Sequence, residues 1–171
     1  MSKTLTEIEK ILNLPDPMLQ FKWRAKTLPF DLPTEYMEGI DLPFNNIGVS
    51  EGVHVASRHY FYPGIHTVSQ FQATFYEDRN GRAHAWIENW KKKVKNFETG
   101  VYQLPSAYKQ KMEVQMLDQK NNAILTATII GCWPADTQPI QLNYTDGSGR
   151  VTLQQTFSCD EVRHVFHRSF G

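Results

Sequence analysis

The sequence lacks the features that mark secreted scaffolds and membrane proteins. Only two of its 171 residues are cysteines, which is too few for a fold held together by several disulfides. Cys132 and Cys159 each fall in an expected strand, so we predict buried thiols, with a disulfide as the alternative. The longest strongly apolar run, residues 123–133, has about half of the ~20 residues that a membrane-spanning helix requires. No basic and then apolar leader opens the chain, so a soluble intracellular protein is expected.

An excess of charge of one sign is also missing. The 18 basic and 18 acidic residues cancel, so net charge does not draw the protein toward nucleic acid or an anionic membrane. We interpret the basic run Lys91, Lys92, Lys93 and Lys95 as the solvated side of an amphipathic helix rather than a nucleic-acid patch. A net charge near zero also removes a barrier to self-association.

Motifs for catalysis, cofactors and metals are absent or weak. The sequence has no phosphate-binding loop, dinucleotide fingerprint or Cys-x-x-Cys pair. The best metal candidate is the pair His164 and His167 with Asp160 and Glu161 nearby, but no second motif supplies further ligands. A solvated tail or a contact between subunits is the preferred interpretation of that segment. We therefore predict a protein that is not an enzyme and that has no cofactor and no metal.

Two stretches alternate apolar residues with neutral polar ones, which is typical of a strand with one buried face. Their polar faces carry no charge, and consist of Gln70, Gln72 and Thr74 in the first and Thr152, Gln154, Thr156 and Ser158 in the second. Gln155 interrupts the apolar side of the second stretch. Exposed strands are usually protected from sticking by charges, so these faces are expected to meet another surface or an enclosed space.

The first part of the chain combines a short helix, a strand and a long connection. Residues 4–14 form an amphipathic helix in the prediction, and residues 19–25 form a strand. The proline-rich connection over residues 28–47 is too hydrophobic for a free coil. We interpret it as an extended arm with a short strand near residues 39–44.

The middle of the chain predicts a hairpin and one long helix. The hairpin has strands at residues 53–61 and 66–76 with its turn at Pro63-Gly64. Residues 82–97 place two tryptophans on one apolar stripe, so this helix is expected to cover the end or flank of a sheet.

Strands dominate the remainder. They are predicted at residues 107–118, at 123–133 where Pro134 ends the strand, and in a last hairpin of residues 140–144 and 150–159. The tail from residue 160 onward has no clear period. The fold class is therefore mainly β with one flanking α-helix and a short N-terminal helix, organised as an extension (1–18), a β domain (19–160) and a C-terminal tail (161–171).

Three short segments in this order resemble the tail tube protein of contractile-tailed bacteriophages. They are residues 23–29 (WRAKTLP), the mid-chain helix with its paired tryptophans, and residues 130–134 (IGCWP). Within them the family signature comprises Trp23, Leu28, Pro29, Gly131, Trp133 and Pro134. The resemblance covers roughly residues 19–160.

The resemblance implies a β-barrel or two-sheet sandwich of about seven or eight strands, similar also to the tube of the type VI secretion system. It implies six-membered rings that stack into a hollow tube in the virion, assembled in the host cytoplasm, through which DNA passes. The partners implied are further copies of the chain, the tail sheath and baseplate or terminator proteins, with no membrane. The additional N-terminal helix favours, as an alternative, a specialised ring at the baseplate or tube end.

Two sets of site residues follow from the combined reasoning. The face of Gln70, Gln72, Thr74, Thr152, Gln154 and Thr156 is expected at the lumen or at a seam between subunits, because a surface without Lys or Arg does not hold a polyanion. The long connection is expected to contact the next ring through Pro29, Phe30, Tyr36, Met37, Ile40 and Phe44. An alternative of another class is a β-sandwich module that binds a carbohydrate or peptide through Tyr60, Tyr62 and Tyr102; a hydrolase using the C-terminal tail is the weakest alternative.

Overall fold

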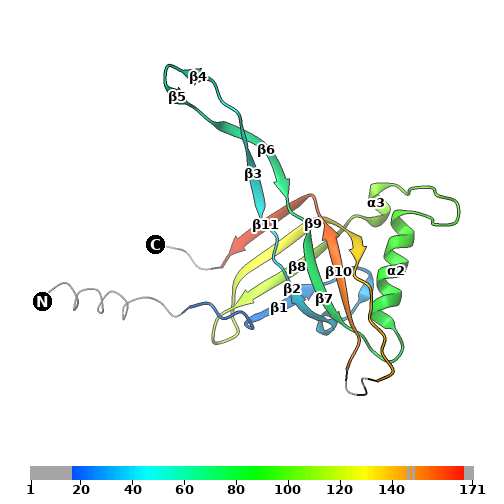
Figure 1. Ribbon diagram of the computed structural model, residues 1–171. Helices are drawn as coiled ribbons and strands as arrows, with labels where there is room; N and C mark the ends of the chain where they lie inside the picture. The colour runs from blue at the N-terminus through cyan, green and yellow to red at the C-terminus, as the bar shows by residue number, and fades with distance from the viewer. Residues whose placement is uncertain (1–16, 146, 148, 168–171) are drawn as a thin grey trace, which may run out of the picture.

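The computed structural model describes residues 17–145, 147 and 149–167 (Figure 1). The helix predicted at residues 4–14 lies outside the described residues. The body is a seven-stranded antiparallel sheet with the order β1-β8-β9-β10-β7-β2, to which β11 is added as a third partner of β9. Its strands are β1 (Trp23–Thr27), β2 (Met37–Ile40), β7 (Phe71–Tyr76), β8 (Gln110–Leu117), β9 (Ala123–Thr137), β10 (Thr152–Ser158) and β11 (Glu161–Phe166).

The sheet is organised around its longest strand, β9. The first half of β9 pairs with β8 on one side and β11 on the other, and its second half pairs with β10. Gly131 separates the two halves with a φ of 71°, a left-handed conformation that glycine adopts without strain. A Cβ at this position would lie 2.2 Å from Oδ2 of Asp160. Glycine is therefore required where β9 passes from one half of the sheet to the other.

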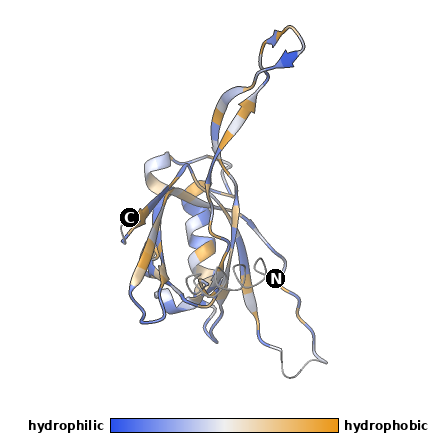
Figure 2. Ribbon diagram, turned by 90° about the vertical axis from the view of Figure 1, so that its left-hand side faces the viewer, coloured by the Kyte–Doolittle hydropathy of each residue, from blue (hydrophilic) through white to orange (hydrophobic). Residues whose placement is uncertain are grey.

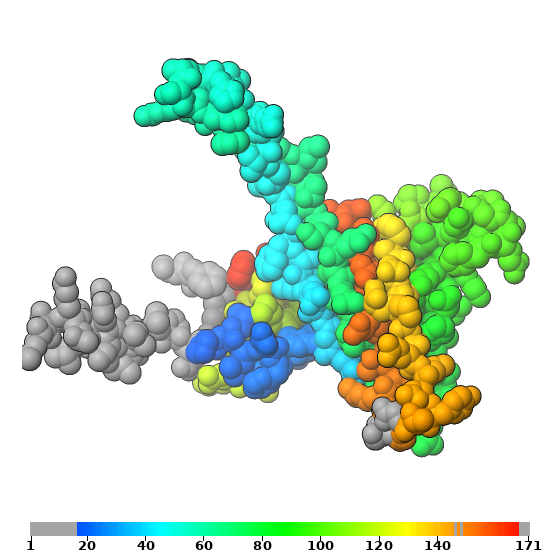
Figure 3. All heavy atoms as spheres, in the orientation of Figure 1, coloured from blue at the N-terminus to red at the C-terminus, as the bar shows by residue number. Residues whose placement is uncertain are grey.

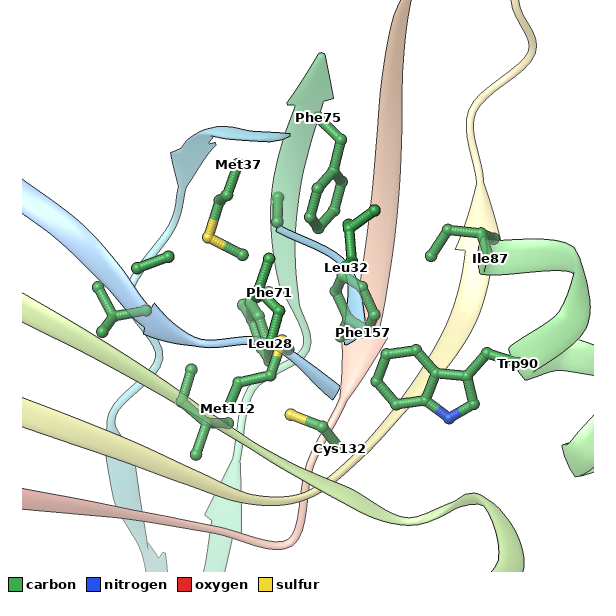
Figure 4. Packing of buried hydrophobic residues seen from close by; sticks show 14 of the residues in the cluster. Leu28, Leu32, Met37, Phe71, Phe75, Ile87, Trp90, Met112, Cys132 and Phe157 are labelled. Carbon is green, nitrogen blue, oxygen red and sulfur yellow. The ribbon is translucent and has the colours of Figure 1, made fainter. Parts of the chain in front are cut away.

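One core joins both ends of the sheet. Side chains of β1 and β8 share a buried cluster with Phe71, Phe75 and Phe157 from β7 and β10 (Figure 4). The helix α2 (Arg82–Val94) adds Trp86 and Trp90, which lie 5.3 Å from Phe75 and 5.5 Å from Phe157 between ring centroids. Each of these buried aromatic side chains contributes about 3–5 kcal/mol against truncation to alanine. The prediction of a mainly β fold with one flanking helix is confirmed.

Side-chain carboxylates hold the beginning of α2. The backbone N–H of Arg82 donates to Asp78, and those of Ala83 and His84 donate to Glu77, so three first-turn donors find acceptors. Tyr36 also donates to Asp78 through its hydroxyl at 2.7 Å. This hydrogen bond is the main reason why the pKa of Asp78 lies below its ordinary value. The helix predicted to residue 97 ends at Val94.

Residues 28–40 of the predicted connection fold in or against the core, which corrects the prediction of an extended arm there, whereas residues 45–47 begin the strand β3 (Asn45–Ser50). The connection contains two 3-10 helices, η1 (Pro29–Asp31) and η2 (Thr34–Tyr36), followed by β2. Leu28, Leu32 and Met37 are buried and point into the core (Figure 4). Their hydrophobicity, which excludes a free coil, is used inside the subunit instead of between subunits.

The hairpin begins and ends eight residues earlier in the chain than predicted and turns elsewhere. Strands β3 (Asn45–Ser50) and β6 (Tyr62–Val68) pair with each other, and β4 (His54–Val55) and β5 (Arg58–His59) form the tip. Pro63-Gly64, the predicted turn, lies inside β6, where Pro63 pairs with Val49. An isolated two-stranded ribbon tolerates proline on its open edge. The turn lies instead between β4 and β5, where Ala56 has a φ of 56°.

The C-terminal half also differs from its prediction in four places. The residues predicted as an irregular tail include β11, which pairs with β9 from Glu161↔Ile130 to Phe166↔Leu125. Pro134 does not end β9, because the strand shifts register there and continues along β10 to Thr137. Residues 140–144 form no strand and run beside β10 as a loop, while the short helix α3 (Pro105–Tyr108) precedes β8. Sequence periodicity does not detect strands whose side chains follow no alternation.

Candidate assembly surfaces

The two uncharged polar stretches lie side by side in the sheet. Strands β7 and β10 pair so that Gln72 faces Thr156 and Thr74 faces Gln154. Cross-strand partners point to the same face of a sheet. Gln154 is exposed and the other three are half-buried. We call Gln72, Thr74, Thr152, Gln154 and Thr156 the polar face.

Charged side chains lie directly beside the polar face. Asp136 of β9 lies opposite Thr156, and Arg150 forms an ion pair with Glu38 at 2.9 Å. Gln70, which the prediction grouped with the face, is exposed and precedes the first residue of β7. The arrangement is a strip of amide and hydroxyl groups across two central strands of the sheet.

The interruption at Gln155 has a structural role on the opposite, core side of β10. Its side chain is fully buried and accepts a hydrogen bond from the hydroxyl of Thr137, which in turn accepts one from the ammonium of Lys91. Its amide donates to the carbonyl of Thr156 at 2.7 Å. A buried amide is tolerated because its hydrogen bonds are made. This chain of contacts ties α2 to β9 and β10.

The hairpin of β3, β4, β5 and β6 projects from the body (Figures 1 and 3). Its large apolar side chains are 47–80% exposed and occur along its whole length (Figure 2): Ile47, Val49, Val53, Val55, Tyr60, Phe61, Tyr62 and Ile65. A two-stranded ribbon is marginally stable alone in water. Apolar surface of this extent on a projecting element marks an interaction site.

Side-chain contacts anchor the root of the hairpin to the edge strand β11. Asn45 donates from Nδ2 to the carbonyl of Val162 at 2.6 Å and accepts from the N–H of Val162 at 3.1 Å. Phe44 packs on the ring of His164 with centroids 5.1 Å apart. His66 of β6 contacts the Asn45 oxygen at 3.1 Å. One amide side chain therefore pairs with an edge strand as a backbone would.

A model of a protein family matches residues 31–164 of this sequence, and the family is described as phage tail tube protein. The chain belongs to the phage tail tube protein family. It is accordingly a structural protein of that family and not an enzyme. The comparison with curated proteins found no match.

Solved structures share the fold of this tail tube protein at low sequence identity. The anti-feeding prophage cap, a tube terminating cap, has a TM-score of 0.71 at 11% identity, covering 97% of this chain and 99% of that one. A sheath-tube complex of an extracellular contractile injection system (PVC) gives 0.66 at 10%, covering 97% and 99%. The SPP1 tail tube gives 0.52 at 10%, covering 90% and 81%. Likeness at this level of identity establishes the fold.

Most side chains that were expected to reach the next ring are buried in this tail tube protein or pack against its core. Pro29 is buried and its carbonyl accepts the indole N–H of Trp86 at 2.8 Å. Phe30 packs edge-on against Trp90, Tyr36 binds Asp78, and Met37 and Ile40 lie in or against the core. Phe44, at 57% exposure, is the exception. Residues of the projecting hairpin are the ones that extend beyond the body.

The signature residues of the tail tube protein serve the sheet and its core. Leu28 is buried and Trp23 packs against the core, while Trp133 lies edge-on to Tyr108 with centroids 6.3 Å apart. Gly131 and Pro134 mark the bulge and register shift of β9. The spacing of Gly131, Trp133 and Pro134 therefore reflects the geometry of β9, the strand that is shared between the two halves of the sheet.

The predicted metal candidate does not converge on one point. His167 contacts the hydroxyl of Thr126 at 2.7 Å, whereas His164 packs on Phe44. In the described part of the chain no group of three or more His, Cys, Asp or Glu side chains is placed to hold a metal ion. Within the same residues, no helix has the length and apolar content needed to cross a membrane.

The tyrosines of the alternative binding module also lie apart. Tyr60 and Tyr62 belong to the hairpin, whereas Tyr102 lies in the loop between α2 and α3 beside Lys95. The functional residue that the sequence analysis missed is Asn45. A lone asparagine before a strand has no distinctive pattern, so only the fold reveals its partner on β11.

Proposed function

We propose that this chain forms a terminal ring of the tail tube in a phage or phage-like injection system, built from several copies, with six as the expected number. The repeated tube subunit is the second candidate. The observation that carries the assembly role is the projecting hairpin with its eight exposed apolar side chains, which has no partner surface within the described residues of its own subunit beyond its root.

Similarity to a terminating cap supports the terminal position. The two chains cover each other almost completely, at 97% and 99%, with a TM-score of 0.71, and a sheath/tube terminator of an extracellular contractile injection system gives 0.64. Sheath, baseplate and terminator proteins are the partners that this position would require. The sheath-tube complex, at a TM-score of 0.66, supports the repeated subunit instead.

The polar face has a role in the same proposal. In a ring, a wall of amides and hydroxyls lines the lumen or a seam between subunits. A lumen without Lys or Arg allows DNA to pass without being held, because phosphate contacts with basic side chains dominate DNA affinity.

Electron microscopy and analytical ultracentrifugation of the purified full chain test the proposal. A terminal ring gives closed rings that do not extend into tubes, whereas a repeated subunit gives stacked tubes. A protein that is strictly monomeric at high concentration, with or without tube partners, contradicts both assembly roles.

Two matched variants separate the hairpin from general surface effects. Ile65 of the hairpin is 80% exposed and Leu142 of the loop beside β10 is 82% exposed. Ile65→Lys is expected to abolish contact with the neighbouring ring, while Leu142→Lys retains it. Equal loss in both variants, with both folded by circular dichroism, would contradict a specific role of the hairpin.

A further inference from the structure

The two cysteines of this chain are neighbours in the fold although they are far apart in the sequence. Ser158 pairs with Trp133, and Glu161 pairs with Ile130. Counting inward from both pairs places Cys159 opposite Cys132. Both are free thiols and both are buried, at 0% exposure for Cys132 and 8% for Cys159.

We propose that Cys132 and Cys159 form a reversible oxidation site, in which a small peroxide converts the thiol pair into a disulfide that joins β9 to the chain between β10 and β11. The proposal is independent of the ring position. Its basis is the placement of the chain's only two cysteines on facing positions of adjacent segments, where a disulfide requires little backbone movement.

The environments of the two thiols differ, and this difference determines which thiol is oxidised first. The neighbouring Cys132 thiol lowers the pKa of Cys159, while burial raises the pKa of Cys132. The thiolate is the nucleophile in cysteine oxidation. Cys159, which is also the more exposed of the two, is therefore the thiol that reacts first.

The reaction is balanced with hydrogen peroxide as the oxidant. The Cys159 thiolate attacks one peroxide oxygen, the O–O bond breaks, and the hydroxide that leaves takes up a proton to become water. The resulting sulfenic acid is then attacked by the Cys132 sulfur, its S–O bond breaks, and a second water leaves with the Cys132 proton. Two thiols are oxidised and one peroxide is reduced to two waters.

A small oxidant suits the limited access to the site. Asp160 follows Cys159 and is held by Lys109 at 2.7 Å, and its carboxylate lies against Gly131. Cys159 is only 8% exposed, which admits a peroxide more readily than a bulky disulfide reagent. The bond would fasten the strand crossing at which β9 changes partner.

The test uses the purified full chain treated with hydrogen peroxide, unfolded, alkylated with iodoacetamide and weighed as an intact protein. The expected product is a single chain that has lost two hydrogens, takes no alkyl group, and returns to two alkylated thiols after dithiothreitol. Its melting temperature should rise by about 5–10 °C, because the bond closes a loop of roughly 30 residues.

Two single variants identify the order of reaction. In Cys132→Ser, Cys159 should stop at the sulfenic acid and be labelled by dimedone. In Cys159→Ser, Cys132 should stay unoxidised and alkylatable. The wild-type chain alone can overturn the proposal. It does so if both thiols can still be alkylated after peroxide treatment, or if disulfides form only between chains.

Discussion

The contact between Asn45 and Val162 allows a quantitative test of how the projecting hairpin is held. The two hydrogen bonds, at 2.6 and 3.1 Å, each contribute about 0.5–1.5 kcal/mol net. Removing both in Asn45→Ala should therefore weaken the attachment by about 1–3 kcal/mol. This corresponds to a rise of about 5- to 150-fold in the population of the detached root.

Hydrogen exchange measures this population directly. The N–H of Val162 donates to Asn45, so deuterium exchange of this one amide, resolved by overlapping peptides of β11, should be faster by that factor in Asn45→Ala. Asn45→Asp keeps the acceptor for this N–H but loses the donor to the Val162 carbonyl. Its exchange should be intermediate, because one of the two bonds is retained.

Asn46→Ala is the matched control. Asn46 is the next residue of β3, and its amide bonds with Ser69 and with the Phe44 carbonyl do not involve β11. Exchange in β11 should match the wild type in this variant. If Asn45→Ala leaves β11 exchange unchanged, or if Asn46→Ala accelerates it equally, the argument that one amide side chain anchors the hairpin fails.

Three further predictions concern the body. Gly131→Ala should lower the free energy of unfolding, measured in guanidinium, by about 2–4 kcal/mol. In an Asp160→Ala background the cost should be only about 1–2 kcal/mol, because the backbone strain remains but the contact with the Asp160 carboxylate is gone. Equal costs in the two backgrounds would contradict a clash between the new methyl group and Asp160. Ion pairs with Lys26 and Lys111 lower the pKa of Glu113. The carboxylate therefore stabilises the fold at neutral pH, and this stabilisation is lost as pH falls below about 4.5. In Glu113→Gln the free energy of unfolding should depend less on pH in this acid range, by less than ~1 kcal/mol. In Gln154→Cys, the new thiol should react with a small maleimide when the subunit is unassembled. In assembled particles it should resist a bulky maleimide attached to a polymer. Complete labelling of assembled particles by the bulky reagent would place the polar face on an outer wall.

Periodicity predicted those parts of the fold in which one face of an element is buried. The helix with Trp86 and Trp90 and the alternating strands β7 and β10 follow directly from residue spacing, because burial imposes a period of 3.6 or 2. The neutral faces of the two strands were predicted separately. The direct pairing of β7 with β10 could not be predicted, because the local sequence does not specify which strands of a sheet are neighbours.

Local turn signals were less informative than the tertiary environment. Pro63-Gly64 is a strong turn signal in isolation, yet it lies in a ribbon whose edges face solvent, where proline has no hydrogen bond to lose. Pro134 likewise sits at a register shift that Gly131 makes possible. The hydrophobic connection was correctly predicted to be ordered, but composition alone does not distinguish burial in the same subunit from burial in another.

The hairpin occupies a separable stretch of the chain. Asn45 and Val68 are Cα partners at its base, and the pairings of the seven-stranded sheet involve no residue from 46 to 67. A short turn from Asn45 to Val68 would therefore remove the projection while leaving every strand of the body its partners. Such a hairpin is a contiguous cassette: it can be lengthened, shortened or exchanged between related subunits as one insertion, so the choice of neighbour can change without redesign of the body.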